Sequence, residues 1–347
     1  MLEGIATSDF HFDGLNKHFI NANDRILAEW DKIYQYALSN GIKHVFIPGD
    51  LSDTPLLDWD TYTKIFLKLK QYDGIINTYY MIGNHDVADS ENTSMNFLNT
   101  LAQNGVFKTF KIYMKPKREV IDNVPVNFIP WYAGQMKTLS DGKEGALNFA
   151  HVEYTGAIGD NGRVLKTKHE LITNKNDYTI SGHIHQYQVL ASKRALYCGN
   201  PFQKNFGEDL PKGFVHFKAE LKGNRIELTH KRVDNKPNFT LQNVIIEDIN
   251  HFKKLEHNDN IRYKLHVNAD VPIPSDLMLQ YPNITGGIWV HGQKKKDSKE
   301  EEIKITKTEV NMRTGLKKFL GAEGMDKDGI KLATAEVKAA QNHLGFR

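Results

Sequence analysis

The chain has 347 residues, of which 40% are apolar and 25% are charged. This balance is typical of globular proteins, and the length allows more than one domain. The formal net charge of +3 is too small to identify a nucleic-acid-binding protein by itself. The single cysteine, Cys198, excludes an internal disulfide and favours a reducing compartment.

The first third of the chain alternates strand and helix signals. Its apolar runs predict strands at residues 4–8, 42–47 and 75–82. Asn23 and Asp24 are candidate caps for a first helix that Gly41 closes, and Thr54-Pro55 is expected to start a second, with proline at its first position. A third helix is expected over residues 91–104.

Strand signals dominate from residue 106 to residue 235. The clearest are residues 124–129, 146–150, 178–181, 189–197 and 213–218. Helix-rich sequence followed by strand-rich sequence predicts an α/β (α+β) domain, in which stacked sheets are flanked by helices.

The pattern changes near Asn235-Lys236-Pro237. Residues 240–292 alternate strand and helix signals, with strands expected at 244–246, 263–267 and 287–291, which predicts a small α/β domain. A charged stretch at 294–302 is expected to be an exposed loop. Two short helices are expected within 313–346. We therefore divide the chain into residues 1–235, 236–310 and 311–347.

Five predicted strands are each followed by side chains that can bind metal. Ligand sites in α/β folds collect at the carboxyl ends of strands, so these positions can form one site. The candidate ligands are Asp9, His11, Asp50, Asn84, His151, His183 and His185. Each short motif by itself is more often only a turn, but the ordered set predicts metal binding.

The mixture of imidazole, carboxylate and amide groups suits two divalent ions and favours manganese, iron or zinc over calcium. Two ions about 3.5–4 Å apart need a bridging ligand, and a carboxylate can provide it. We assign the bridge to Asp50.

The ordered ligand set resembles the calcineurin-like metallophosphoesterase superfamily over residues 9–185. This resemblance implies a two-sheet β-sandwich flanked by helices. Further segments resemble the SbcD-like nucleases, which act in DNA repair and recombination and include bacteriophage recombination nucleases. These segments are residues 7–11, 49–53, 82–86, 129–131, 197–201, 206–208 and 212–214.

The resemblance implies a role for each site residue. Asp9, His11 and His185 would hold one ion, and Asn84, His151 and His183 the other, with Asp50 shared. His85 would contact the scissile phosphate or the leaving oxygen. The Asp53 carboxylate could orient His85 through a hydrogen bond; the alternative is a capping carboxylate near a helix start.

By the same resemblance, the activity would be manganese-dependent hydrolysis of DNA, by exonuclease and endonuclease cleavage. Residues 236–310 would form a capping domain that positions DNA. Residues 311–347 would dock on an SbcC-like coiled-coil ATPase, with the nuclease as a homodimer inside a heterotetramer. The residues that contact DNA are not identified, since the basic clusters 111–118 and 294–296 are more simply explained as solvated faces.

Three alternatives stay open. The chain could be a protein phosphatase or a cyclic-nucleotide phosphodiesterase with the same metal site, or a non-catalytic scaffold with the same fold. The first residues show no signal-peptide pattern, and no apolar run is long enough to cross a membrane. We therefore expect a cytoplasmic protein, associated with the nucleoid or, if a phage encodes it, in the host cytoplasm.

Overall fold

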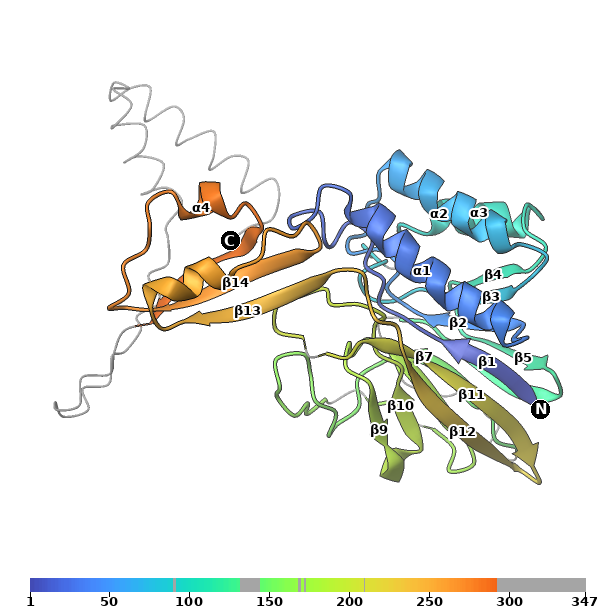
Figure 1. Cartoon of the computed structure of the whole chain (residues 1–347). Coiled ribbons are helices and arrows are strands. Elements are labelled where there is room, and N and C mark those ends of the chain that lie inside the picture. Colours follow the sequence, from blue (N-terminus) through green and yellow to red (C-terminus); the bar gives the residue numbers. More distant parts are fainter. Residues whose placement is uncertain (90–91, 132–143, 168–169, 172, 209, 292–347) are drawn as a thin grey trace, which may run out of the picture. The chain divides into compact units, whose positions relative to one another are not determined.

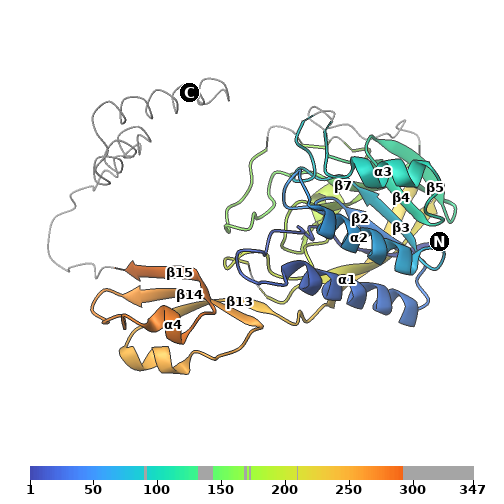
Figure 2. The same cartoon turned by 90° about the horizontal axis from the view of Figure 1, so that it is seen from above.

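The computed structural model describes residues 1–89, 92–131, 144–167, 170–171, 173–208 and 210–291. These residues contain three sheets and four α-helices, as Figures 1 and 2 show. The predicted class, a mixed α/β fold with two main sheets and flanking helices, is confirmed. The two helices expected within 313–346 lie outside the described residues.

The first sheet has the strand order β12-β11-β1-β2-β3-β4. Its parallel centre consists of β1 (Leu2–Ala6), β2 (His44–Pro48), β3 (Asn77–Met81) and β4 (Phe110–Tyr113), and β11 (Gly213–Lys222) and β12 (Arg225–Asp234) add an antiparallel hairpin. All five residues of β2 are buried. Such a continuous apolar strand is expected where both faces of a parallel sheet are covered.

The second sheet has the order β5-β6-β7-β8-β10-β9. Its strands are β5 (Lys117–Ile121), β6 (Val124–Ile129), β7 (Leu147–His151), β8 (Tyr178–Gly182), β9 (Gln188–Leu190) and β10 (Ala195–Tyr197). The two sheets share an aromatic core. Phe46 of β2 stacks on Phe149 of β7 with ring centroids 4.0 Å apart. This contact fixes the two sheets against each other at the middle of both strands.

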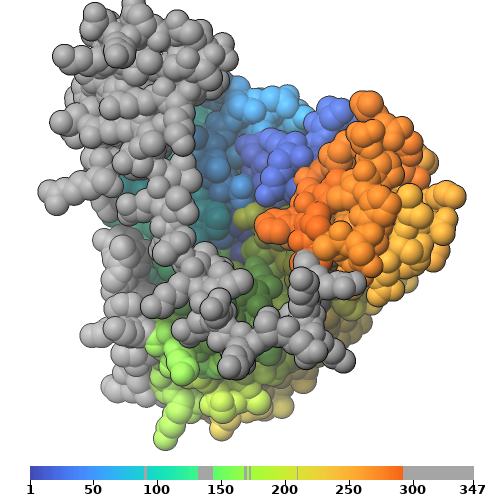
Figure 3. Space-filling model, turned by 90° about the vertical axis from the view of Figure 1, so that its left-hand side faces the viewer, coloured from blue at the N-terminus to red at the C-terminus, as the bar shows by residue number. Residues whose placement is uncertain are grey.

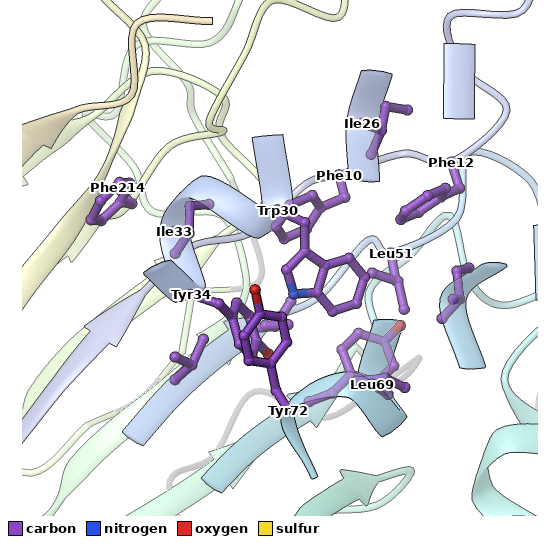
Figure 4. Close-up of a cluster of buried hydrophobic side chains, with 14 of the residues drawn as sticks. Phe10, Phe12, Ile26, Trp30, Ile33, Tyr34, Leu51, Leu69, Tyr72 and Phe214 are labelled. Atoms are coloured by element: carbon purple, nitrogen blue, oxygen red, sulfur yellow. The ribbon is translucent and has the colours of Figure 1, made fainter. Parts of the chain in front are cut away.

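Helices α1 (Ala22–Ser39), α2 (Trp59–Tyr72) and α3 (Asn96–Gln103) share a second core with the first sheet. Trp30 of α1 lies in this core among Phe10, Phe12, Tyr34 and Leu51 (Figure 4). Phe10 and Phe12 pack on Trp30 with ring centroids 5.0 and 6.0 Å away. His11, which lies between these two phenylalanines, is therefore held by the core.

The starts of both long helices differ from the sequence-based expectation. Thr54-Pro55 does not begin α2, because the carboxylate of Asp58 accepts a hydrogen bond from the Thr61 amide at 2.7 Å and caps the helix there. Asn23 does not cap α1, which already begins at Ala22.

The segment expected as one strand over 189–197 is split. A 3-10 turn at Ala191–Lys193 separates β9 from β10, with Arg194 in a left-handed conformation (φ 49°). The turn reverses the chain so that β9 and β10 pair antiparallel.

A third, smaller sheet contains β13 (Thr240–Ile246), β14 (Ile261–Asn268) and β15 (Ile284–His291), all parallel. The 3-10 helix Ile249–Lys254 and α4 (Leu277–Gln280) contribute to its core. Figure 3 shows this sheet, coloured orange, beside the N-terminal segment, where Thr285 hydrogen-bonds His18 at 3.0 Å. The sheet belongs to the compact unit Met1–Gln293, so the boundary at 235/236 stays a prediction.

Candidate metal centre

The seven predicted ligands come together at one edge of the two main sheets. They follow β1, β2, β3 and β8 or, in the case of His151, end β7. Because β1, β2 and β3 are parallel, and β7 and β8 are parallel, their carboxyl ends meet.

The facing atoms form two neighbouring groups. In the first, Nε2 of His11 lies 3.1 Å from Nε2 of His185, with Asp9 in the same cluster. In the second, Oδ1 of Asn84 lies 2.9 Å from both Nε2 of His151 and Nδ1 of His183.

Asp50 lies between the two groups. Its Oδ2 atom is 3.3 Å from Nε2 of His151 and 3.8 Å from Nε2 of His11. A carboxylate at this position could serve both groups of ligands; the ligand assignments stay predictions.

Each of the four histidines directs one ring nitrogen at the cluster and the other at an oxygen atom. In His151 this second nitrogen faces the main-chain carbonyl of Pro48 at 2.8 Å. In the other three histidines it faces a carboxylate. Those pairs are His11 with Asp53 at 3.3 Å, His183 with Glu153 at 3.2 Å, and His185 with both Glu208 and Asp160 at 2.9 Å. Metal-binding histidines are oriented in this way, so the donor set fits divalent ions.

Burial and neighbouring carboxylates shift the pKa values of the four histidines in opposite directions. Burial lowers the pKa of His11 to about 3 and that of His183 to about 4. Burial also opposes protonation of His151 and His185, but Asp50 raises the pKa of His151 to about 9. Asp160 and Glu208 raise that of His185 to about 10. Buried carboxylates that hold protons on neighbouring imidazoles provide a site for cations.

Four predicted ligands have left-handed backbone conformations. Their φ angles are 59° for Asp9, 47° for His11, 52° for Asp50 and 83° for His183. Such a conformation costs about 1–3 kcal/mol at a non-glycine residue. Burying one phenylalanine contributes about 1.5–3 kcal/mol, so the buried aromatic residues on either side of His11 can offset the strain there.

Two glycines let the ligand segments approach each other. A Cβ atom at Gly49 would lie 2.0 Å from Nδ1 of His151, and one at Gly83 would lie 2.1 Å from Oδ1 of Asp50. The strand-end glycines therefore allow contacts that any other side chain would block.

Asp86, which the sequence analysis did not assign, links the segments after β2 and β3. Its fully buried carboxylate accepts hydrogen bonds from the amides of Asp50 (3.0 Å), Ser52 (2.9 Å) and Gly83 (2.7 Å) and from the Tyr80 hydroxyl (2.5 Å). Burial and the charge of Asp50 raise the pKa of Asp86 to about 6. The only sign in the sequence that Asp86 belongs to the site was its place in the run Gly83-Asn84-His85-Asp86.

His85 lies beside the cluster with its side chain 38% exposed. Its Nδ1 atom faces the main-chain carbonyl of Asp53 at 2.9 Å, whereas the Asp53 carboxylate is 4.0 Å away. The expected orienting contact thus comes from the main chain of Asp53. The carboxylate instead faces His11, at 3.3 Å, and Lys204, at 2.5 Å.

Sequence reasoning also did not assign Glu208, Asp160, Glu153 or Lys204 to the site. Glu208 belongs to a segment that the resemblance includes, but nothing in that segment shows that its carboxylate reaches His185. The basic cluster 111–118 is largely paired at the surface, since Lys111 and Lys117 contact Glu119.

Comparison with known proteins agrees with this geometry. The profile of the calcineurin-like phosphoesterase family matches residues 5–187, just over half of the 347 residues. The match spans all seven predicted ligands. Among solved structures, the phosphoesterase Yfce from E. coli is similar over 68% of this chain and 100% of its own, with 12% sequence identity. Its TM-score of 0.31 is too low to support a functional argument.

No curated protein matches the chain. Within the described residues, no helix is both long enough and apolar enough to cross a membrane.

Proposed function

The chain belongs to the calcineurin-like phosphoesterase family, and we propose that within this family it is a manganese-dependent nuclease that hydrolyses DNA. The observation that supports this most directly is the arrangement of the four histidines. Each has one ring nitrogen at the cluster and the other held by an oxygen, which prepares the set for divalent ions.

The segments that resemble SbcD-like nucleases lie against these ligands. Trp131 stacks on His183 with ring centroids 5.7 Å apart, and Glu208 faces Nδ1 of His185 at 2.9 Å. Trp131 and Glu208 are not among the seven predicted ligands; they belong to segments that resemble the SbcD-like nucleases in particular. These two contacts therefore favour a nuclease over a general phosphatase.

The protein's own groups would position the phosphate and the leaving oxygen. Asp9, His11 and His185 would hold one ion, and Asn84, His151 and His183 the other, with Asp50 shared. Bound ions would neutralise phosphate oxygens and activate water for attack. Nδ1 of His85 is occupied by the Asp53 carbonyl. Nε2 has no hydrogen-bond partner among the described residues and is free for a substrate oxygen.

The test is a comparison of substrates with the purified chain. We expect manganese to support cleavage of linear duplex DNA and of circular single strands, and chelation to abolish it. A serine phosphopeptide and a cyclic nucleotide, assayed in parallel, should be poor substrates. Turnover of either without DNA cleavage would assign the chain to another branch of the family.

We further propose that residues 311–347 dock on an SbcC-like ATPase. This segment lies outside the described residues, so the proposal rests on its apolar spacing at Ile330, Ala333, Val337, Ala340 and Leu344. Deleting residues 313–347 should spare hydrolysis of bis-p-nitrophenyl phosphate but abolish co-purification with the ATPase and ATP-stimulated DNA cleavage. Undiminished affinity of the truncated chain for the ATPase would contradict this.

A further inference from the structure

The loop between β10 and β11 places the ammonium group of Lys204 beside the candidate metal centre. The ammonium of Lys204 lies 2.5 Å from Oδ1 of Asp53 and 3.1 Å from Nδ1 of His11. Only 13% of the Lys204 side chain is exposed. A lysine is seldom this buried without a specific partner.

The contacts of this ammonium within the described part of the chain leave one of its N–H donors without a partner. Lysine has three N–H donors, and one of them can face the Asp53 carboxylate, with which the ammonium forms an ion pair. A second can face Nδ1 of His11, 3.1 Å away. The described residues supply no partner for the third N–H of the ammonium. A phosphate oxygen is the acceptor that a substrate of this family would bring.

The three-stranded sheet holds the loop on one side of Lys204. The side chain of Gln203 forms two hydrogen bonds with the main chain of Leu241 in β13, at 3.0 and 3.1 Å. Asn243 of β13 donates its side-chain amide to the carbonyl of Phe206. The Phe206 ring lies against Gly286 of β15, where a Cβ atom would approach it to 2.7 Å.

Glu208 holds the same loop on the side of the metal ligands. Its carboxylate accepts hydrogen bonds from the main-chain amides of Lys204, at 3.3 Å, and Asn205, at 3.2 Å. It also pairs with Lys212 at 2.7 Å and with His185 at 2.9 Å. Lys204 is therefore fixed between a predicted ligand and the small sheet.

We propose that Lys204 binds a phosphate oxygen of the substrate, and that the three-stranded sheet positions it through Gln203 and Phe206. This inference rests on the proposed function in that the substrate is a phosphate ester. By this inference the three-stranded sheet affects the site directly. The seven predicted ligands do not by themselves need that sheet.

Binding measurements on Lys204→Met and Lys204→Arg test the first part. With Lys204→Met, we expect about a tenfold rise in the inhibition constant of inorganic phosphate and in KM for bis-p-nitrophenyl phosphate, because a charged hydrogen bond is lost. Affinity for a fluorescent single-stranded oligonucleotide, measured with calcium, should show a salt dependence reduced by about one phosphate contact. Lys204→Arg should recover part of the affinity.

Lys222→Met is the matched control. It also removes one positive charge, but its exposed side chain pairs with Glu220 at the far end of β11. Metal content should be unchanged in both variants. The inference is overturned if Lys204→Met behaves like Lys222→Met, or if it loses the ions and so proves to be part of the ligand scaffold. If the unmodified chain does not bind the oligonucleotide, only the nuclease proposal is contradicted. The role of Lys204 is then still tested by phosphate inhibition and by KM for bis-p-nitrophenyl phosphate.

A double-mutant cycle tests the role of the sheet. Gln203→Ala should raise KM in the unmodified background but have little further effect in Lys204→Met, because both changes remove the same contact. If Gln203→Ala does not fold, Asn243→Ala is a second variant. It removes the exposed hydrogen bond from β13 to the Phe206 carbonyl. Additive effects of Asn243→Ala and Lys204→Met on KM, or no effect of Asn243→Ala, would exclude positioning by the sheet.

Discussion

Replacing Asp50 with alanine is expected to abolish phosphodiester hydrolysis and to lower the bound manganese from two ions per chain. The Asp50 carboxylate lies between His151 and His11, at 3.3 and 3.8 Å, so its loss affects both groups of ligands. Changing a residue that merely supports a ligand costs about 10–100-fold in affinity or activity, and loss of a shared ligand should cost more. Elemental analysis and bis-p-nitrophenyl phosphate hydrolysis measure the two effects.

Asp50 has a left-handed backbone, so substitution could also strain the chain. Asp50→Asn keeps the shape of the side chain and tolerates this conformation. The matched control is Asp122→Asn, which changes an aspartate with a similar φ of 48° in the turn between β5 and β6. Thermal unfolding should be similar in the two variants, while only Asp50→Asn loses activity. Full manganese-dependent activity in either Asp50 variant would refute the two-metal assignment.

Replacing His85 with alanine is expected to preserve the bound ions and to reduce turnover by about 10²–10⁴-fold, the range of a general acid. His85 is anchored by the main chain of Asp53 at 2.9 Å and by a hydrogen bond from its own amide to Oδ1 of Asp50, also at 2.9 Å. The second contact does not need the imidazole, so the ligand segment should keep its path. Metal content and kcat are the measurements that separate binding from chemistry.

His251→Ala is a suitable control, because among the described residues the His251 side chain contacts neighbours in its own segment, with Asp248 at 3.2 Å. It should leave kcat unchanged. If His85→Ala releases the ions together with the activity, His85 is a ligand and its assignment here is wrong. If it changes neither, the leaving oxygen is stabilised by another group.

The strand-end motifs predicted much of the site because the rule behind them is local. A buried apolar run followed by glycine and a polar side chain, as at Gly49-Asp50 and Gly83-Asn84, places that side chain at the carboxyl end of a strand. Parallel neighbours then bring such ends together. The helix start at Thr54-Pro55 was predicted wrongly, because a better cap at Asp58 competes with the preference for proline at a first helical position.

The sequence by itself determined the mixed α/β class, the main strands and the residues whose chemistry suits divalent ions, because periodicity and side-chain chemistry are properties of short segments. Only the tertiary structure decided how these groups are used. It placed Asp86 under the segments after β2 and β3, Glu208 on His185, and Lys204 between Asp53 and His11. Those contacts join residues far apart in the chain, and they depend on how the sheets pack and on where the loop after β10 is anchored, which no local pattern encodes.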